Sequence, residues 1–154
     1  YTVNLPANAL GERNRVMVEA TGNVTEACSA AGEATDLSLN FIYGTQILVQ
    51  SLSISLNTAT SLTVVGSNRP ALVTAEIIAD GATNRQSAML RYSGPTNSGF
   101  LDLVGTGRGT VDSTLVQTLG ITAQFAHTNS AGAVHSHACH FLVFRNATLS
   151  VDSM

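Results

Sequence analysis

Apolar and polar residues alternate along most of this chain, and this period of two most constrains its fold. The alternation is clear in RVMVEATGNV (15–24), LSLNFIYG (37–44) and ILVQSLSISL (47–56), and it continues in most later segments. Successive side chains of a β-strand point to opposite faces of the sheet, so the pattern predicts strands with one buried face. Gly, Asn, Ser and Pro separate the segments, as turns require. The sequence therefore predicts an all-β domain.

Two long blocks indicate how these strands are arranged. Residues 133–153 contain no proline or glycine, and their odd positions from Phe141 to Val151 are expected to share one face. Residues 37–56 form a similar block that is broken only at Gly44. Long strands of this kind are typical of antiparallel sandwiches and jelly rolls, in which they bend and serve both sheets. We therefore expect a jelly-roll-like antiparallel β-sandwich, with a right-handed parallel β-helix as the alternative.

The N-terminus differs from the remainder, so we divide the chain into a segment over 1–15 and a single all-β domain over 16–154. Tyr1, Val3 and Leu5 alternate in a short apolar stretch that ends at Pro6, and polar residues follow. Such a segment is either an edge strand of its own domain or a donor strand that completes the sheet of a neighbouring subunit. In the second case Tyr1, Val3 and Leu5 are the subunit contacts.

The charge content restricts the partners and the compartment of the protein. Charged residues make up 11% of the chain, the net charge is −3, and all seven basic residues are arginine. The arginines are scattered, which argues against a nucleic-acid partner, and no apolar run is long enough to span a membrane. A surface this poor in charge suits a glycosylated protein or a subunit whose faces are covered by neighbours. We expect an extracellular or cell-surface protein.

Two further features accord with that compartment. Cys28 and Cys139 can form one disulfide, which would close a very long loop and stabilise the fold by about 4–5 kcal/mol in the chain-entropy model. Asn23 and Asn146 each begin an Asn-x-Thr glycosylation sequence. Matches to so short a motif arise by chance, so the two asparagines are candidates only.

The stretch AVHSHACHF (133–141) holds three of the four histidines, which suggests a metal site. His135 and His137 project from one face of a strand with Cβ atoms about 7 Å apart, which suits zinc or copper. Cys139 lies about 13 Å from His135 along an extended strand, too far to share one ion without a bulge. A third ligand must come from elsewhere, and His127, across a hairpin through TNSAGA, is the candidate. The competing interpretation is a polar strand end beside a Cys28–Cys139 disulfide, which we favour.

No segment carries a catalytic signature. GTGRGT (105–110) lacks the G-x-G-x-x-G spacing and no helix pattern follows it, so we interpret it as a turn between strands. Neither G-x-S-x-G nor H-E-x-x-H is present, and the chain has no tryptophan. We expect no enzyme activity and no resident cofactor.

Three functions fit these observations. The first is a non-enzymatic extracellular structural subunit that self-assembles by β-strand addition into a fibre, pilus, coat or surface layer. The second is a monomeric adhesion or ligand-binding module of a larger surface protein. The third is a metalloprotein built on the His-x-His pair. We favour the homo-oligomeric structural subunit.

Overall fold

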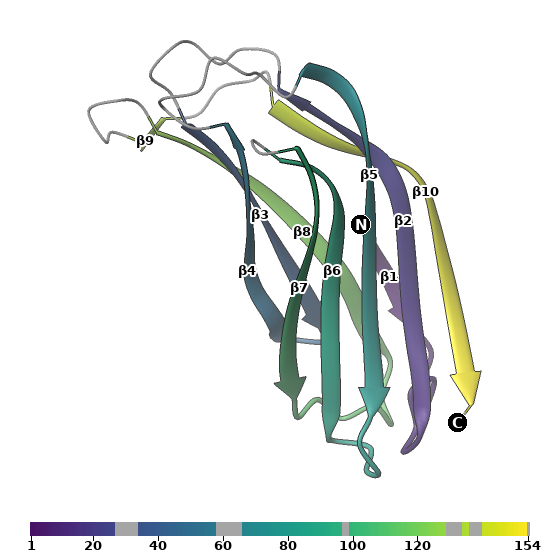
Figure 1. Cartoon of the computed structure of the whole chain (residues 1–154). Coiled ribbons are helices and arrows are strands. Elements are labelled where there is room, and N and C mark those ends of the chain that lie inside the picture. Colours follow the sequence, from purple (N-terminus) through teal and green to yellow (C-terminus); the bar gives the residue numbers. More distant parts are fainter. Residues whose placement is uncertain (27–33, 58–65, 97–98, 129–133, 136–139, 154) are drawn as a thin grey trace.

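The alternating segments form two antiparallel β-sheets packed face to face, as the computed structural model of the chain shows (Figure 1). The structure describes residues 1–26, 34–57, 66–96, 99–128, 134–135 and 140–153. Every strand pairing within these residues is antiparallel. The predicted β-sandwich is therefore confirmed, and the parallel β-helix is excluded.

The first sheet, sheet A, has the strand order β1-β8-β3-β4. Its strands are β1 (Thr2–Leu5), β8 (Gln117–Thr128), β3 (Ala34–Tyr43) and β4 (Gln46–Asn57). A two-residue strand, β9 (Val134–His135), pairs with the far end of β8. β3 and β4 form a hairpin through Gly44, whose φ of +59° favours glycine, so the predicted break in that block is a tight turn.

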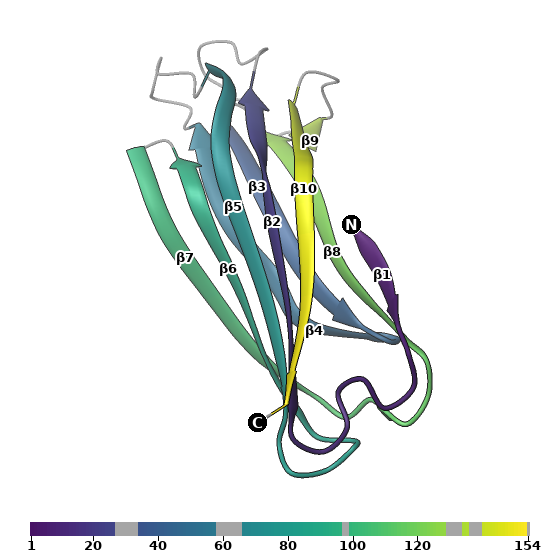
Figure 2. The ribbon, with the colours of Figure 1, turned by 90° about the vertical axis from the view of Figure 1, so that its right-hand side faces the viewer.

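The second sheet, sheet B, has the order β10-β2-β5-β6-β7. Its strands are β10 (His140–Ser153), β2 (Asn14–Glu26), β5 (Gly66–Ala79), β6 (Gln86–Thr96) and β7 (Gly99–Gly109). The N-terminal strand β1 is an edge strand of sheet A, and the C-terminal strand β10 is an edge strand of sheet B. The two edge strands lie on the same side of the sandwich (Figure 2).

The core lies between the sheets and is built from the apolar side chains that occupy every second position of the strands. In β2, for example, Val16, Val18 and Ala20 are fully buried while Glu19 between them is exposed. The largest fully buried side chains come from both sheets and from the loop after β1: Tyr43, Tyr92, Phe41, Leu5, Leu10, Leu37, Leu39, Ile54, Leu56, Ile77, Leu90 and Leu119. Burial of this apolar surface is the main favourable term in folding.

The interpretation of GTGRGT as a turn is wrong, because residues 105–109 belong to β7 and pair with β6. Gly105, Gly107 and Gly109 alternate along the face of β7 that meets β4, where the two sheets close together. A Cβ on Gly107 would collide with the backbone carbonyl of Leu48. These glycines are therefore required by the close approach of two strands rather than by a turn.

The expected uninterrupted alternation over 133–153 is also wrong. β10 begins at His140, and its register with β2 shifts between Phe144 and Asn146, which is a β-bulge at Arg145. An extra residue reverses the phase of the side chains. Phe144 packs against the core from an even position, whereas after the bulge Leu149 and Val151 lie opposite the buried Val18 and Val16 from odd positions.

Candidate functional site

The residues predicted for a metal site fall only partly within the described chain. β9 pairs with β8 so that His135 lies directly opposite His127, which is the hairpin geometry that the hypothesis needed. His137 and both cysteines, Cys28 and Cys139, lie outside the described residues. Among the described residues, no group of three or more His, Cys, Asp or Glu side chains is placed to hold a metal ion. Zinc or copper binding and the disulfide stay predictions.

The N-terminal segment occupies a place in its own sheet. Thr2–Leu5 pairs with Gln117–Gly120 of β8, and the backbone of Tyr1 exchanges two hydrogen bonds with Ile121. Leu5 is buried in the core, whereas Tyr1 is 39% exposed. β1 thus takes the edge-strand arrangement of the two that the sequence left open, and donation to a neighbour stays a prediction.

The two glycosylation candidates both lie on strands of sheet B. Asn23, on β2, is half-buried, and with its amide oriented to satisfy its neighbours it accepts hydrogen bonds from Nε and Nη2 of Arg145 at 3.2 Å. Asn146, on β10 beside the bulge, is exposed. Asn146 is therefore the more accessible acceptor.

β1 of sheet A and β10 of sheet B are the terminal strands on one side of the sandwich (Figure 2). Ala147, Leu149 and Val151 of β10 lie opposite fully buried residues of β2, so they face the same way, toward the interior. Yet Leu149 is 39% exposed, Val151 is 48% exposed, and Ala147 is also exposed. We call these three residues the β10 strip. They are inward-facing apolar residues that sheet A does not cover.

The opposite edge of sheet B also exposes large apolar side chains. Phe100, Leu101 and Val104 of β7 are 65%, 43% and 53% exposed, and we call them the β7 edge. Strand β4 lies against Gly105, Gly107 and Gly109 on the inward face of β7. Leu101 shares that face but precedes the glycines, whereas Phe100 and Val104 alternate with them and lie on the outer face. Sheet B thus carries exposed apolar residues on both of its terminal strands. The sequence showed these residues as ordinary strand positions and gave no sign that they would be uncovered.

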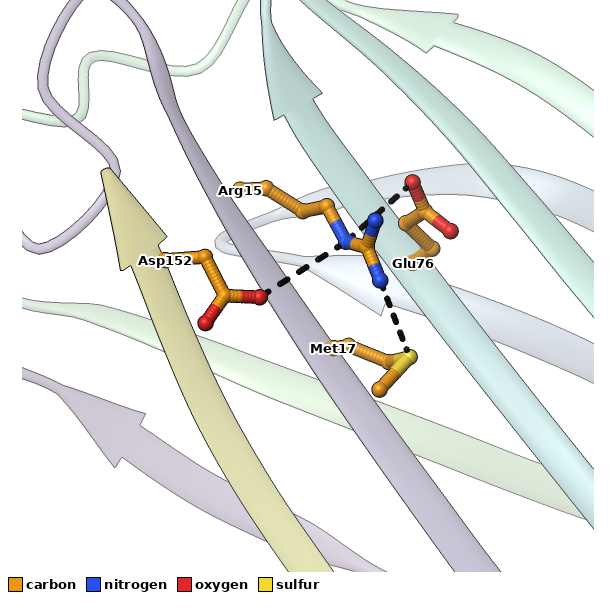
Figure 3. A network of polar contacts seen from close by, with 4 residues as sticks. All are labelled: Arg15, Met17, Glu76 and Asp152. Atoms are coloured by element: carbon orange, nitrogen blue, oxygen red, sulfur yellow. Dashed lines mark hydrogen bonds and ion pairs between the residues drawn. The ribbon is translucent and has the colours of Figure 1, made fainter. Parts of the chain in front are cut away.

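The outer face of sheet B carries most of the ion pairs of the described chain. Arg15 of β2 lies between two carboxylates, with Nε 3.5 Å from Glu76 of β5 and 3.9 Å from Asp152 of β10 (Figure 3). Its Nη2 donates a hydrogen bond to the sulfur of Met17. The guanidinium therefore joins three neighbouring strands across the face.

A second cluster on the same face joins β6 to β7. Nη2 of Arg91 donates to Asp102 at 2.6 Å, and the Ser93 hydroxyl donates to the other oxygen of that carboxylate. The hydrogen bond from Ser93, followed by that from Arg91, lowers the pKa of Asp102 below its ordinary 3.8. Asp102 is thus held as a carboxylate that accepts hydrogen bonds, and no proton donor for acid catalysis arises here.

Two hollows lie on this outer face. One, of about 430 Å³, is lined by Glu76, Met89 and Arg108 among others. The other, of about 470 Å³, is lined by Leu72, Phe100 and Arg145 among others. Both are open depressions on a sheet surface with mixed apolar and charged linings.

Comparisons with known proteins do not identify a family. No family model matches the sequence, and no curated protein matches it. The alginate lyase from Klebsiella pneumoniae, a solved structure, aligns with 88% of this chain at 10% sequence identity and a TM-score of 0.38. The chain spans 59% of the length of that protein. A likeness this remote carries no argument about function.

No helix in the described part of the chain has the length and hydropathy of a membrane-spanning segment.

Proposed function

We propose that this protein is a non-enzymatic extracellular structural subunit that assembles with copies of itself through the edges of sheet B. The observation that supports this most directly is that both terminal strands of one sheet expose large apolar side chains. These strands are long, with 14 residues in β10 and 11 in β7. Each edge is a potential contact with another copy.

An unpaired strand edge presents a row of N–H and C=O groups that can pair with another chain. Monomeric proteins commonly block such edges with lysine, proline, bulges or covering loops. This chain has no lysine, and neither β7 nor β10 contains proline. The bulge in β10 lies at Arg145, so the eight residues Asn146–Ser153 keep a regular register with β2.

Two edges on each copy allow the assembly to grow. A single self-complementary contact gives a closed dimer, whereas two different contacts on one subunit propagate into a fibre or layer. β1 already completes sheet A of its own chain, so the proposal places the contacts on sheet B instead. The low charge of the chain keeps electrostatic repulsion between copies small.

The extracellular setting rests on the sequence. The charged fraction of 11%, the pair of cysteines and the two Asn-x-Thr sequences suit a secreted protein. The intact mass of native material before and after reduction reports the disulfide and any glycans together, and a mass without either would remove this support.

The assembly itself is tested by sedimentation velocity over a range of concentrations, with negative-stain microscopy. The wild-type chain should form species larger than dimers as its concentration rises. Leu149→Lys on the β10 strip and Val104→Lys on the β7 edge should each prevent fibres, because a charge at an edge opposes pairing. Thr21→Lys, at an exposed position on the interior strand β2, is the matched control and should assemble like the wild type.

Circular dichroism confirms that each variant is folded. A wild-type chain that stays a monodisperse monomer at its highest soluble concentration would overturn the proposal.

The two hollows on the outer face favour a second candidate, a ligand-binding module. A strand-addition assembly leaves this face free, so the two functions are compatible. Arg108→Ala and Leu72→Ala alter one hollow each, and isothermal titration against soluble glycans and peptides would detect the loss of a ligand. Absence of binding to the wild type would remove this candidate and leave the assembly untouched.

A further inference from the structure

The part of β10 beyond its bulge has two chemically distinct rows of side chains. The inward row is the apolar β10 strip, Ala147, Leu149 and Val151. The outward row is polar and consists of Asn146, Thr148, Ser150 and Asp152. The bulge leaves Arg145 on the outward side as well, where it reaches Asn23. Any strand that pairs here must match one apolar row and one polar row.

We infer that the strand which pairs with this edge is β10 of a second copy, antiparallel and related by a two-fold axis at Leu149. This inference rests on the proposed self-assembly and specifies one of its two contacts. A two-fold axis perpendicular to the sheet keeps the inward faces of both copies on the same side. The two five-stranded sheets then join into one continuous sheet.

This register places like rows together. Leu149 faces Leu149 of the partner subunit, and Ala147 and Val151 face each other in both directions. In the outward row, Thr148 faces Ser150, and Asn146 faces Asp152. Directly opposed pairs in antiparallel strands interact most strongly, and none of these pairs opposes like charges.

Neighbouring registers fit less well. Moving the axis to Thr148 places the bulged Arg145 opposite Val151, where the ladder is disrupted. Moving it to Ser150 keeps an equal overlap, residues 147–153, but places Asp152 opposite Thr148 and away from the partner subunit's Arg145. The Leu149 axis therefore keeps the bulge out of the paired region and also brings Arg145 beside the partner subunit's Asp152.

The two charges of β10 support the antiparallel direction. Arg145 and Asp152 lie at opposite ends of the regular stretch, both on the outward side. An antiparallel partner therefore brings each Arg145 next to the partner's Asp152, twice by symmetry, whereas a parallel partner would oppose like charges. Asp152 is 55% exposed and lies 3.9 Å from Arg15, so its carboxylate is accessible to a second guanidinium.

The test uses two charge reversals in the full chain, with Val104→Lys present throughout to disable the β7 edge. This parent should form dimers only. Arg145→Glu opposes two acidic residues at both symmetric contacts, and Asp152→Arg opposes two arginines. Each variant alone should dimerise about tenfold more weakly than the parent, as expected for two partly exposed contacts turned from attraction to repulsion.

Mixing the two variants gives the decisive result. A mixed dimer has complementary charges at both contacts, so its dissociation constant should return to within about threefold of the parent value. Native mass spectrometry with one variant isotopically labelled distinguishes mixed dimers from homodimers. Arg108→Glu on β7 and Glu12→Arg in the turn before β2, both exposed and away from the paired stretch of β10, change the net charge equally and should not alter dimerisation.

The failures of the two proposals are distinguishable. If the parent dimerises but the reversals have no effect, or the mixture does no better than its components, the β10 register is overturned while self-assembly stands. If neither the wild type nor the parent associates at any concentration, both proposals fail.

Discussion

The closest approach between the two sheets gives a sharp stability prediction at Gly107. Substitution by alanine would place a Cβ against the backbone carbonyl of Leu48, and a backbone atom cannot rotate away as a side chain does. Without that contact, alanine would stabilise a strand position by about 0.5–1 kcal/mol relative to glycine. Overpacking of a close-packed site costs about 1–3 kcal/mol, and a collision with a backbone atom lies in the upper half of that range, so we expect a net loss of about 1–2 kcal/mol.

The assay is thermal and urea unfolding followed by far-UV circular dichroism, because the chain has no tryptophan. At a concentration at which the chain is monomeric, the loss corresponds to a Tm lower by about 2–8 °C for a domain of this size. Gly105→Ala is the matched control on the same strand face. There the added Cβ lies 2.6 Å from a methyl of Val49, a side-chain atom that can move, so the loss should be smaller.

A Gly107→Ala variant as stable as the wild type, or more stable, would refute the reasoning. It would mean that the sheets are not in contact at this position and that the glycine alternation of β7 has another cause. A loss at Gly105 equal to that at Gly107 would also contradict the distinction between backbone and side-chain neighbours.

Three further predictions concern buried polar groups and ionisation. Gln86→Leu should lower the free energy of unfolding by about 2–4 kcal/mol, because the buried Gln86 amide hydrogen-bonds both the N–H and the C=O of Val111. A loss below about 1 kcal/mol in urea titrations would contradict this prediction. Burial, with a smaller effect of Asp112, raises the pKa of Tyr43 from 10.0 to about 12. The stability that the neutral phenol contributes is therefore complete below pH 10 and is lost as the pH rises to about 12. Absorbance of the Tyr43 phenolate near pH 10 in a spectrophotometric titration would contradict this prediction. The lowered pKa of Asp102 contributes stability above pH 3.8, and this stability is lost as the pH falls through the folded-state pKa. Ser93→Ala should move the pKa of Asp102 back toward 3.8 in an NMR titration. An unchanged pKa would show that the Ser93 hydroxyl is not the main cause of the lowering.

The proposed assembly depends on residues that a sequence pattern describes incompletely. Leu149 and Val151 occupy the apolar phase of a strand, and their pattern predicts burial. They are nevertheless exposed, because burial also requires an opposing layer, and sheet A does not extend over β10. The pattern of one strand contains no information about the width of the sheet that faces it.

The sequence by itself determined the alternating strands and the all-β class, and it favoured a sandwich over a parallel β-helix without deciding between them. These follow from local physics, because alternation with a period of two has one geometric meaning and Gly44 permits the positive φ of a tight hairpin. Only the tertiary structure decided two other features: the bulge at Arg145 that reverses the phase of β10, and the packing of Gly107 against β4. Each depends on contacts between residues far apart in the chain or on register with a partner strand, which the order of residues in one segment does not specify.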